Sequence, residues 1–334
     1  MKKLVALLLA AVMLLALTAC GEKTETAAPA DTSSTSSSAS SSGAKLRFVT
    51  GGESGTYYAF GSVIAQHATN NAGVNVVGLV GNGSQANVME LQDGNAELAF
   101  CQSDVMAYAY NGTNLFEETG KVDCFSTVAA LYMEQVQIVT TDASIKSVAD
   151  LAGKRVSIGS AGSGVYFNAI DILGAYGLTE NDIIPTYQSF GDSANDIKDG
   201  KIDAAFIVAG APTTAITDLA TTKDVYLVSL DDEHIESLCA TSDYYTKNPA
   251  DVYGTDGDVT TVAVGAVILA RDDVSEDAIY NFTKDLFDNA EAEVSSHAKY
   301  GELNLDFAAS VTSVPYHPGA AKYFAEKGYT VATK

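Results

Sequence analysis

Over the body of the chain, apolar residues occur either in short continuous runs or with the spacing of an α-helix. Short apolar runs of strand length occupy residues 46–50, 74–80 and 96–102, and stretches with helical spacing at 56–71 and 84–92 separate them. We therefore predict the succession strand, helix, strand, helix, strand. Such alternation is typical of an α/β fold with a mainly parallel sheet.

The same succession returns later in the chain. A predicted strand at 156–159 is followed by a glycine-rich turn and by a helix that begins at Val165. Units of α/β proteins resemble one another locally, but here order and spacing both recur, which favours a true repeat. We predict two lobes built on one plan. Three segments carry the repeat: residues 54–58 match 163–167, 83–87 match 191–195, and 93–100 match 199–206.

Two further apolar strands, 136–141 and 260–270, are candidates for the connections between the lobes. The first lobe is expected to comprise residues 44–139 together with 266–334, and the second lobe residues 140–265. A two-lobed protein with two crossing segments closes around a ligand by hinge bending. Ligands of open α/β sheets lie beyond the carboxyl ends of the strands, which is where the repeated glycine turns are expected.

The amino-terminal segment carries separate signals. Lys2 and Lys3 precede an apolar stretch at 4–19 that is too short to span a membrane, so residues 1–19 are expected to be a signal peptide. The ending Leu-Thr-Ala-Cys resembles the lipobox of bacterial lipoproteins, which implies lipidation of Cys20. An ordinary signal peptide that happens to meet a cysteine is the alternative. Residues 20–43 are rich in serine, and such a disordered tether spans roughly 25–30 Å.

These signals predict an extracytoplasmic protein anchored to the bacterial cell membrane by lipidated Cys20. No apolar run long enough to span a membrane follows the signal peptide, so the lipid is the expected membrane contact.

Composition limits the classes of function. The chain has 334 residues, enough for two lobes with cores, and 19 Lys and Arg against 42 Asp and Glu give a net charge of −23. So acidic a chain argues against a nucleic-acid partner, because phosphates need a positively charged surface. The charge says less about small anions, which a few oriented backbone N–H groups can hold.

Three cysteines follow Cys20, namely Cys101, Cys124 and Cys239. An odd number leaves at most one pair, so we expect no disulfide framework. Cys101 lies in an apolar run and is expected to be a small buried hydrophobic residue.

The two glycine turns are the strongest candidates for a binding site. Each opens a helix whose first N–H groups lack partners within the helix and whose dipole favours an anion. Gly55 and Gly164 would let a ligand approach the backbone closely. A plain strand-to-helix turn is the alternative, but two matching turns favour a site. Residues that follow the turns or end the elements of the first lobe complete the candidate set: Thr56, Tyr57, Ser163, Tyr166, Asn87, Gln102 and Ser103.

The chain contains three arginines, Arg47, Arg155 and Arg271, and none of them lies in a glycine turn. A bidentate arginine clamp on a ligand carboxylate is therefore not expected. Helix N-termini and hydroxyl groups are the predicted donors instead.

Other patterns point only weakly to catalysis. Residues 81–86 fit G-x-G-x-x-A with Asp104 about 20 residues further on, but this turn follows the second strand of its unit. The sequence has no G-x-S-x-G elbow, its four His residues lack metal-ligand spacing, and the acidic stretch 251–258 lacks the calcium-loop pattern. We expect a non-enzyme without metal or cofactor. The alternatives are a secreted hydrolase or dehydrogenase, or a ligand sensor, using the same cleft.

Residues 50–58, Thr-Gly-Gly-Glu-Ser-Gly-Thr-Tyr-Tyr, resemble the opening motif of the TAXI family, the solute receptors of tripartite ATP-independent periplasmic (TRAP) transporters. Met133 and Ala211 depart from the family pattern. The resemblance covers essentially residues 45–330 and continues at 83–87, 94–104, 131–134, 159–166, 210–212 and 315–320.

This resemblance implies a type II periplasmic-binding-protein fold, with two α/β lobes and a hinge between them. It implies capture of a small organic anion, such as glutamate or 2-oxoglutarate, and delivery to the membrane subunits of a TRAP permease. It also adds Val165 and Pro212 to the candidates. The expected ligand-binding residues are then Gly55, Thr56, Tyr57, Asn87, Gln102, Ser103, Ser163, Gly164, Val165, Tyr166 and Pro212.

Overall fold

The computed structural model describes residues 45–250, 252–253 and 259–334. The predicted signal peptide, Cys20 and the serine-rich tether lie outside this range, as does most of the acidic stretch 251–258. Within the described residues, no helix combines the length and apolar character that crossing a membrane requires.

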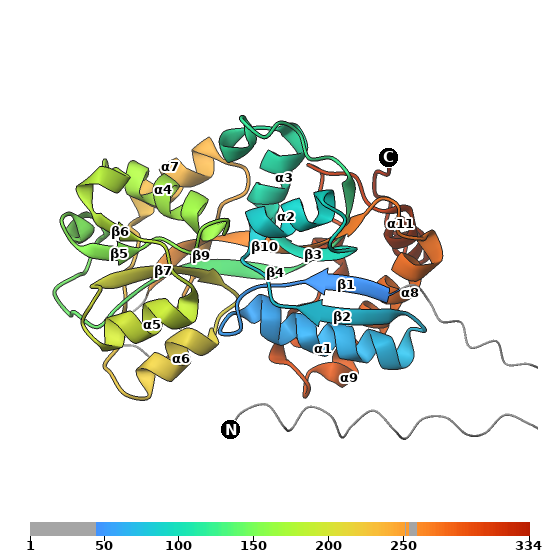
Figure 1. The fold of residues 1–334 in the computed structure, drawn as a ribbon, viewed down its shortest axis with the longest axis horizontal. Coiled ribbons are helices and arrows are strands. Elements are labelled where there is room, and N and C mark those ends of the chain that lie inside the picture. The colour runs from blue at the N-terminus through green and yellow to red at the C-terminus, as the bar shows by residue number, and fades with distance from the viewer. Residues whose placement is uncertain (1–44, 251, 254–258) are drawn as a thin grey trace, which may run out of the picture. The chain divides into compact units, whose positions relative to one another are not determined.

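A ten-stranded sheet runs through the described chain in the order β2-β1-β3-β10-β4-β7-β5-β6, with β8 paired to β4 and β9 paired to β10 (Figure 1). The strands are β1 (Lys45–Val49), β2 (Asn75–Leu79), β3 (Leu98–Gln102), β4 (Phe125–Thr140), β5 (Arg155–Ser157), β6 (Ile184–Thr186), β7 (Ala204–Ala209), β8 (Tyr226–Leu227), β9 (Thr246–Pro249) and β10 (Thr260–Arg271).

Helices connect these strands, and the first two begin and end where the sequence predicted. The α-helices are α1 (Thr56–Asn71), α2 (Ser84–Gln92), α3 (Ser103–Asn111), α4 (Val165–Ala175), α5 (Phe190–Lys198), α6 (Thr214–Ala220), α7 (Asp232–Thr241), α8 (Glu276–Asp288), α9 (Ala290–Glu293), α10 (Leu305–Ala308) and α11 (Pro318–Glu326). Four short 3-10 helices add η1 (Asn114–Phe116), η2 (Val148–Leu151), η3 (Glu180–Asp182) and η4 (Ala298–Glu302).

The predicted repeat is present in the topology. In the first lobe, β1 lies between β2 and β3 and is parallel to both. In the second lobe, β5 lies between β6 and β7 and is parallel to both. The two units therefore share one strand order, which confirms two lobes built on one plan. We use "first lobe" for the unit of β1–β3 with α1–α3 and "second lobe" for the unit of β5–β7 with α4–α6.

Two long antiparallel strands, β4 and β10, join the lobes. β4 pairs with β10 from Phe125 to Gln135 and with β7 from Gln135 to Thr140, so one strand serves both halves of the sheet. β10 is paired with β3 near its end and with β9 near its start. The expected connections at 136–141 and 260–270 lie in these strands, although β4 begins eleven residues earlier than expected (136 − 125). The exact lobe boundaries stay a prediction.

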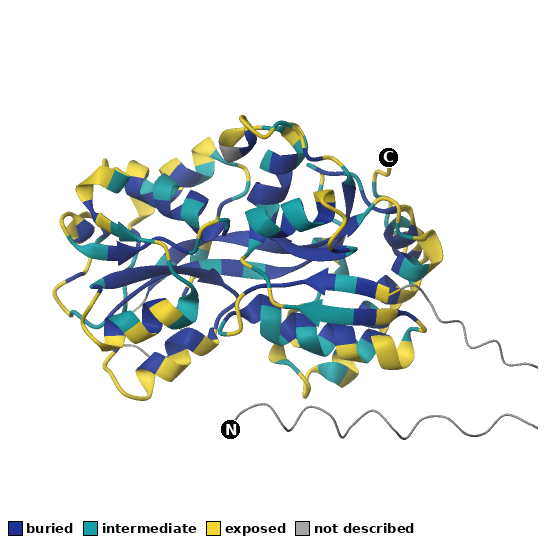
Figure 2. Ribbon diagram, viewed as in Figure 1, coloured by how far each residue is buried: buried dark blue, intermediate teal, exposed yellow. Residues whose placement is uncertain are grey.

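Each half of the sheet is covered on both faces. In the first lobe, Phe48 and Phe100 pack with α1, α8 and α11, whereas the alternate residues Val49 and Cys101 pack with α2 and α3. In the second lobe, α4 and α7 cover one face and α5 and α6 the other. The central strands β3, β4, β7 and β10 are accordingly buried on both sides, and exposed residues lie mainly on loops and on the outer helix surfaces (Figure 2). This layering leaves the carboxyl ends of the parallel strands as the place for a site.

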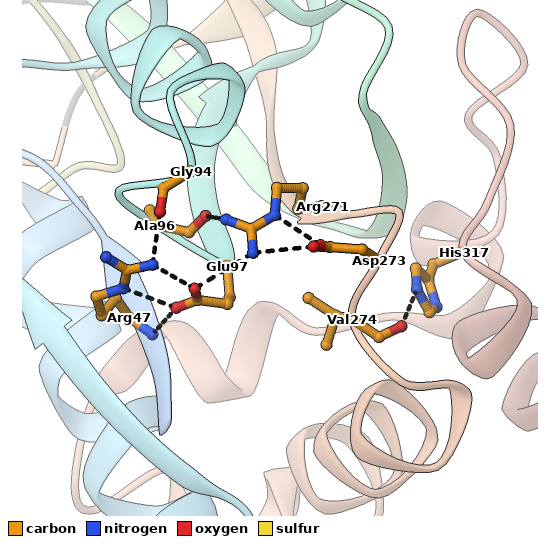
Figure 3. A network of polar contacts seen from close by, with 8 residues as sticks. All are labelled: Arg47, Gly94, Ala96, Glu97, Arg271, Asp273, Val274 and His317. Atoms are coloured by element: carbon orange, nitrogen blue, oxygen red, sulfur yellow. Dashed lines mark hydrogen bonds and ion pairs between the residues drawn. The ribbon is translucent and has the colours of Figure 1, made fainter. Parts of the chain in front are cut away.

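The repeat also includes an arginine–carboxylate ion pair in each unit, which we call an ionic clamp. Arg47 Nε and Nη2 donate to the two carboxylate oxygens of Glu97 at 3.0 and 2.5 Å, and Nη2 also donates to Gly94 O at 2.7 Å (Figure 3). In the second unit, Arg155 Nε and Nη2 donate to the two carboxylate oxygens of Asp203 at 3.0 and 2.6 Å. Arg155 Nη1 also donates to the carbonyl of Gly200 at 2.9 Å. Each clamp ties the first strand of a unit to the start of its third.

The third arginine, Arg271, belongs to the first of these clamps. Its guanidinium donates to Ala96 O at 2.9 Å and to Asp273 at 2.6 Å, and it lies 3.5 Å from Glu97 (Figure 3). All three arginines therefore hold strand ends together. Cys101, Cys124 and Cys239 are free thiols, and Cys101 is buried as expected.

Candidate functional site

A cavity of about 430 Å³ lies at the carboxyl ends of the parallel strands. The turns after β1, β2, β5 and β6 form its walls, and the ends of β3 and β7 close it. Both lobes therefore contribute to one cavity, at the position expected for an α/β binding site. Its lining comprises residues 51–57, 80–84, Gln102, Glu134, Ser160, 163–165, 189–192, Asn195, Val208 and Ala209.

Seven of the eleven expected residues line this cavity: Gly55, Thr56, Tyr57, Gln102, Ser163, Gly164 and Val165. Thr56 does so with its hydroxyl already engaged, because Oγ1 donates to Gly210 O at 2.6 Å. Tyr57 stacks on Phe100 with 4.5 Å between ring centroids. The lining thus includes both repeated turns, one from each lobe.

The other four expected residues lie outside the cavity lining. Asn87 Nδ2 donates to the carbonyls of Thr50 and Phe100 at 2.5 and 2.9 Å, so it ties the first turn to β3. Ser103 Oγ accepts from Gly265 N at 3.0 Å. Tyr166 points its hydroxyl to Glu180 at 3.0 Å. Pro212 follows β7 in a cis peptide and is likewise outside the lining. Asn87 and Ser103 hold the walls of the cavity from behind.

Three helix starts converge on the cavity. α1 follows Gly55, α2 follows Gly83 and α4 follows Gly164, and none of these three starts has a side-chain cap. Ser163, a residue that is 5% exposed, adds a hydroxyl whose Oγ is buried and has no hydrogen-bond partner among the described residues. Uncapped helix starts carry partial positive charge and free N–H groups, so this arrangement suits an anion.

Close packing of the turns explains why glycine occurs here. A Cβ on Gly164 would lie 1.8 Å from Gln102 Oε1, and one on Gly81 would lie 2.5 Å from Asn87 Oδ1. Gly83 has a φ of 103°, a conformation that other residues rarely adopt, and a Cβ there would meet Ser163 at 3.2 Å. Gly83 and Gly164 therefore let the two lobes approach each other beside the cavity, whereas Gly81 lets its turn pack on Asn87 within the first lobe.

A buried polar network joins the lobes next to the cavity. Gln102 Nε2 donates to Asn168 Oδ1 at 2.6 Å, and Asn168 Nδ2 donates to Asp104 at 2.9 Å and to the Tyr245 hydroxyl at 2.9 Å. Tyr245 in turn donates to Asp171 at 2.8 Å. Burial raises the pKa of the Asp104 carboxyl to about 6. The first lobe is thus bonded to α4 through side chains that water does not reach.

Glu134 is one of the lining residues that sequence reasoning did not propose as ligand contacts, and it is the most deeply buried acid among them. It lies on β4, is 2% exposed, and accepts a hydrogen bond from the Tyr57 hydroxyl at 2.5 Å. Because the carboxyl is buried and no cation among the described residues is hydrogen-bonded to it, its pKa is raised to about 8. A single glutamate inside an otherwise mostly apolar strand is the signal that could have identified it.

The charge of the lining is one-sided. It includes Glu53, Glu134 and Asp192, and no Lys, Arg or His is among the lining residues of the described chain. Within the same residues, no cluster of His, Cys, Asp and Glu has the geometry of a metal site. Backbone N–H groups and hydroxyls are therefore the available donors for an anionic group.

The architecture is that of a two-lobed α/β protein, as the sequence predicted. The chain belongs to the NMT1-like family, which it matches over residues 48–328. A solved protein of Bordetella bronchiseptica RB50 shares the fold at 14% identity and a TM-score of 0.53, over 85% of this chain and 81% of that one.

Two further solved structures are similar to the chain. One is the alkanesulfonate-binding protein SsuA from Xanthomonas axonopodis pv. citri bound to MOPS, with 16% identity and a TM-score of 0.48 over 87% of this chain and 86% of that one. The other is a putative L-cystine ABC transporter protein from Listeria monocytogenes, with 17% identity and a TM-score of 0.49 over 81% of this chain and 99% of that one.

Proposed function

We propose that the protein is an extracytoplasmic solute receptor that binds a small organic anion in the cavity between its lobes and delivers it to a membrane permease. The observation that carries this proposal is the convergence of three uncapped helix starts on one cavity that both lobes line. Two continuous strands, β4 and β10, connect the lobes and supply the hinge.

The ligand carboxylate is held, in this proposal, by the N–H groups at the starts of α1 and α4 and by the free hydroxyl of Ser163. The exposed acidic residues Glu53 and Asp192 at the same cavity favour a ligand that also carries an ammonium group. An amino acid such as glutamate offers a carboxylate to the helix starts and an ammonium group to the acidic residues, whereas 2-oxoglutarate offers only carboxylates. The TAXI-like motifs support glutamate and a TRAP permease as the particular ligand and partner.

An enzyme is the less favoured function for this cavity. Five serines line it, but neither His nor Cys is present among the described lining residues, so a serine hydroxyl there has no imidazole to activate it. A sensor would use the same cavity without a permease. Deleting the genes of the proposed partner permease separates these roles, because a transport receptor then loses its effect on uptake whereas a sensor keeps its response.

Calorimetric titration of the protein with glutamate, glutamine, 2-oxoglutarate and the sulfonate MOPS tests the ligand class. We expect one site per chain, with glutamate bound most tightly because it matches both the helix starts and the acidic lining. Tighter binding of MOPS would assign the site to sulfonates, and absence of binding by every anion would reject the proposal.

Membrane attachment is tested on the full chain, since Cys20 lies outside the described residues. Cell fractionation of the wild type and of Cys20→Ala should place the first with membranes and release the second, because a lipid anchor needs the cysteine thiol. A Cys20→Ala protein that stays with the membranes would contradict the anchor.

A further inference from the structure

Glu134 presents one carboxylate oxygen to Tyr57 and its other oxygen to no described donor. The Tyr57 hydroxyl donates to Oε2 at 2.5 Å, and this is the one hydrogen bond that Glu134 makes with its side chain among the described residues. The residue is nevertheless 2% exposed and lines the ligand cavity. Burial with so few hydrogen-bond donors disfavours the ionised form of a carboxyl group.

The groups that face Glu134 do not supply a free positive charge. Tyr57 on α1 and Tyr132 on β4 are neutral phenols, whose pKa values burial raises well above the usual range. Asp104 on α3 adds a further acid. Lys299 on η4 is the nearby cation, but its Nζ already donates to Ala211 O at 2.9 Å and to Glu302 at 2.5 Å. Glu302 therefore largely neutralises Lys299.

We propose that Glu134 is a specificity-determining residue that stays a neutral carboxylic acid and donates a hydrogen bond from its free oxygen to an anionic group of the ligand. The inference rests on the proposed function, because it assigns a donor to the anion of that same cavity. It explains how a cavity with an acidic lining, and with no basic side chain among its described residues, can accept an anion. The pKa of Glu134, raised by burial to about 8, agrees with this protonation state near neutral pH.

The same arrangement makes ligand affinity depend on pH with a defined sign. Below the pKa of Glu134 the carboxyl holds its proton and can donate to the ligand. Above it the ionised group repels the anion and must take up a proton when the ligand binds, so each further pH unit lowers the affinity about tenfold. Binding at alkaline pH is then accompanied by uptake of up to one proton per ligand.

The test is calorimetric titration with 2-oxoglutarate and glutamate between about pH 6.5 and pH 9.5, in two buffers of different ionisation enthalpy. 2-Oxoglutarate has no ammonium group, so a fall in its affinity reports on the protein. For the wild type we expect a flat affinity up to about pH 7.5, then a fall of about tenfold per pH unit with proton uptake.

Two variants identify the group responsible. Glu134→Gln keeps a neutral donor of similar shape, so it should bind at pH 6.5 within about threefold of the wild type and show a flat profile. Glu233→Gln removes an exposed acid from the first turn of α7, remote from the cavity lining, and should keep the wild-type slope. Thermal melting of each variant confirms that it is folded.

The outcomes separate the inference from the proposed function. Loss of binding in folded Glu134→Gln at pH 6.5 would show that an ionised carboxylate is needed, which overturns the inference while the receptor function stands. A flat wild-type profile up to pH 9.5 would overturn it in the same way. If neither anion binds the wild type at any pH, the proposed function fails first and the inference fails with it.

Discussion

Gly164 illustrates, at the scale of the residue, how the absence of a side chain shapes the site. Its φ of −71° is open to any residue, so conformation does not require glycine here. Contact does, because a Cβ would lie 1.8 Å from Gln102 Oε1 and 2.9 Å from Ser84 Oγ. Gln102 cannot simply move aside, since it is 3% exposed and donates to Asn168 across the lobes.

Gly164→Ala should therefore displace Gln102, break its bond to Asn168 and weaken ligand binding by tenfold or more, about 1.4 kcal/mol. Calorimetric titration measures this loss. The control is Gly174→Ala, near the end of the same helix, where a Cβ would meet nothing within 4 Å. It should keep the affinity and raise stability by about 0.5–1 kcal/mol, because alanine favours helix. Equal affinity in both variants would contradict the proposed site.

Asp104 carries a pH dependence of stability. Burial raises the pKa of its carboxyl to about 6, so its contribution to stability is complete below the unfolded pKa of about 3.9 and is lost as pH rises through about 6. Asp104→Asn cannot ionise and removes this loss. Between about pH 4 and pH 7, the stability of the variant relative to the wild type should rise by up to about 3 kcal/mol.

Denaturant unfolding of both proteins across that pH range measures the difference. Asp218→Asn, an exposed change on α6, should give a difference that does not vary with pH in this way. A flat difference for Asp104→Asn would mean that Asp104 is not the group that titrates.

At the scale of the element, the bounds of helices α1 and α2 could be predicted from the sequence, whereas those of strand β4 could not. α1 and α2 begin and end as predicted because glycines flank each of them, Gly55 and Gly73 for α1 and Gly83 and Gly94 for α2. β4 was predicted only from 136 because its earlier part includes Ser126, Thr127 and Glu134. These polar side chains are buried through partners distant in sequence, such as Asp272 for Ser126, which no local pattern reveals.

The lining of the cavity was likewise predicted only in part, because sequence shows local repeats but not contacts between distant segments. The repeated turns around Gly55 and Gly164 were identified because repetition is visible in the chain itself. Phe190 and Glu134 were missed, since their place in the lining depends on how the lobes meet. Asn87 as a ligand contact stays a prediction; its Nδ2 donates to the carbonyls of Thr50 and Phe100, and no local sequence pattern distinguishes such a supporting amide from one that faces a ligand.

The paired arginine clamps give a prediction for the strands they hold. Arg155→Gln and Arg47→Gln each remove a bidentate bond between the first strand of a lobe and the acid that precedes its third. Both variants should melt at lower temperature than the wild type, as thermal unfolding will show. Both should keep ligand affinity within about twofold, because neither side chain lines the cavity. A tenfold loss of affinity in Arg155→Gln would instead favour an arginine at the ligand.

Contacts between the lobes govern access to the cavity at the scale of the whole molecule. Besides the Gln102–Asn168 bond, Ala86 N donates to Gly162 O at 2.9 Å and Ala215 N donates to Ser54 O at 3.2 Å. The cavity has walls from both lobes, so exchange of ligand requires these bonds to open.

Small-angle scattering should therefore give a smaller radius of gyration with saturating ligand than without it. Asn168→Ala removes three bonds of the interlobe network and should enlarge the radius of the free protein further. Identical radii with and without ligand would contradict hinge closure.

The position of β10 in the sheet has a consequence for biosynthesis. β10 is the last strand in sequence, yet it lies between β3 and β4 and pairs with both. A nascent chain that has not reached Thr260 can form the parallel unit β2-β1-β3, but it leaves β3 and β4 with unfilled edges and the first lobe unfinished. The ribosome must therefore release most of the polypeptide before either half can complete its hydrophobic core, and a fragment truncated ahead of β10 is expected to be a substrate for chaperones and proteases.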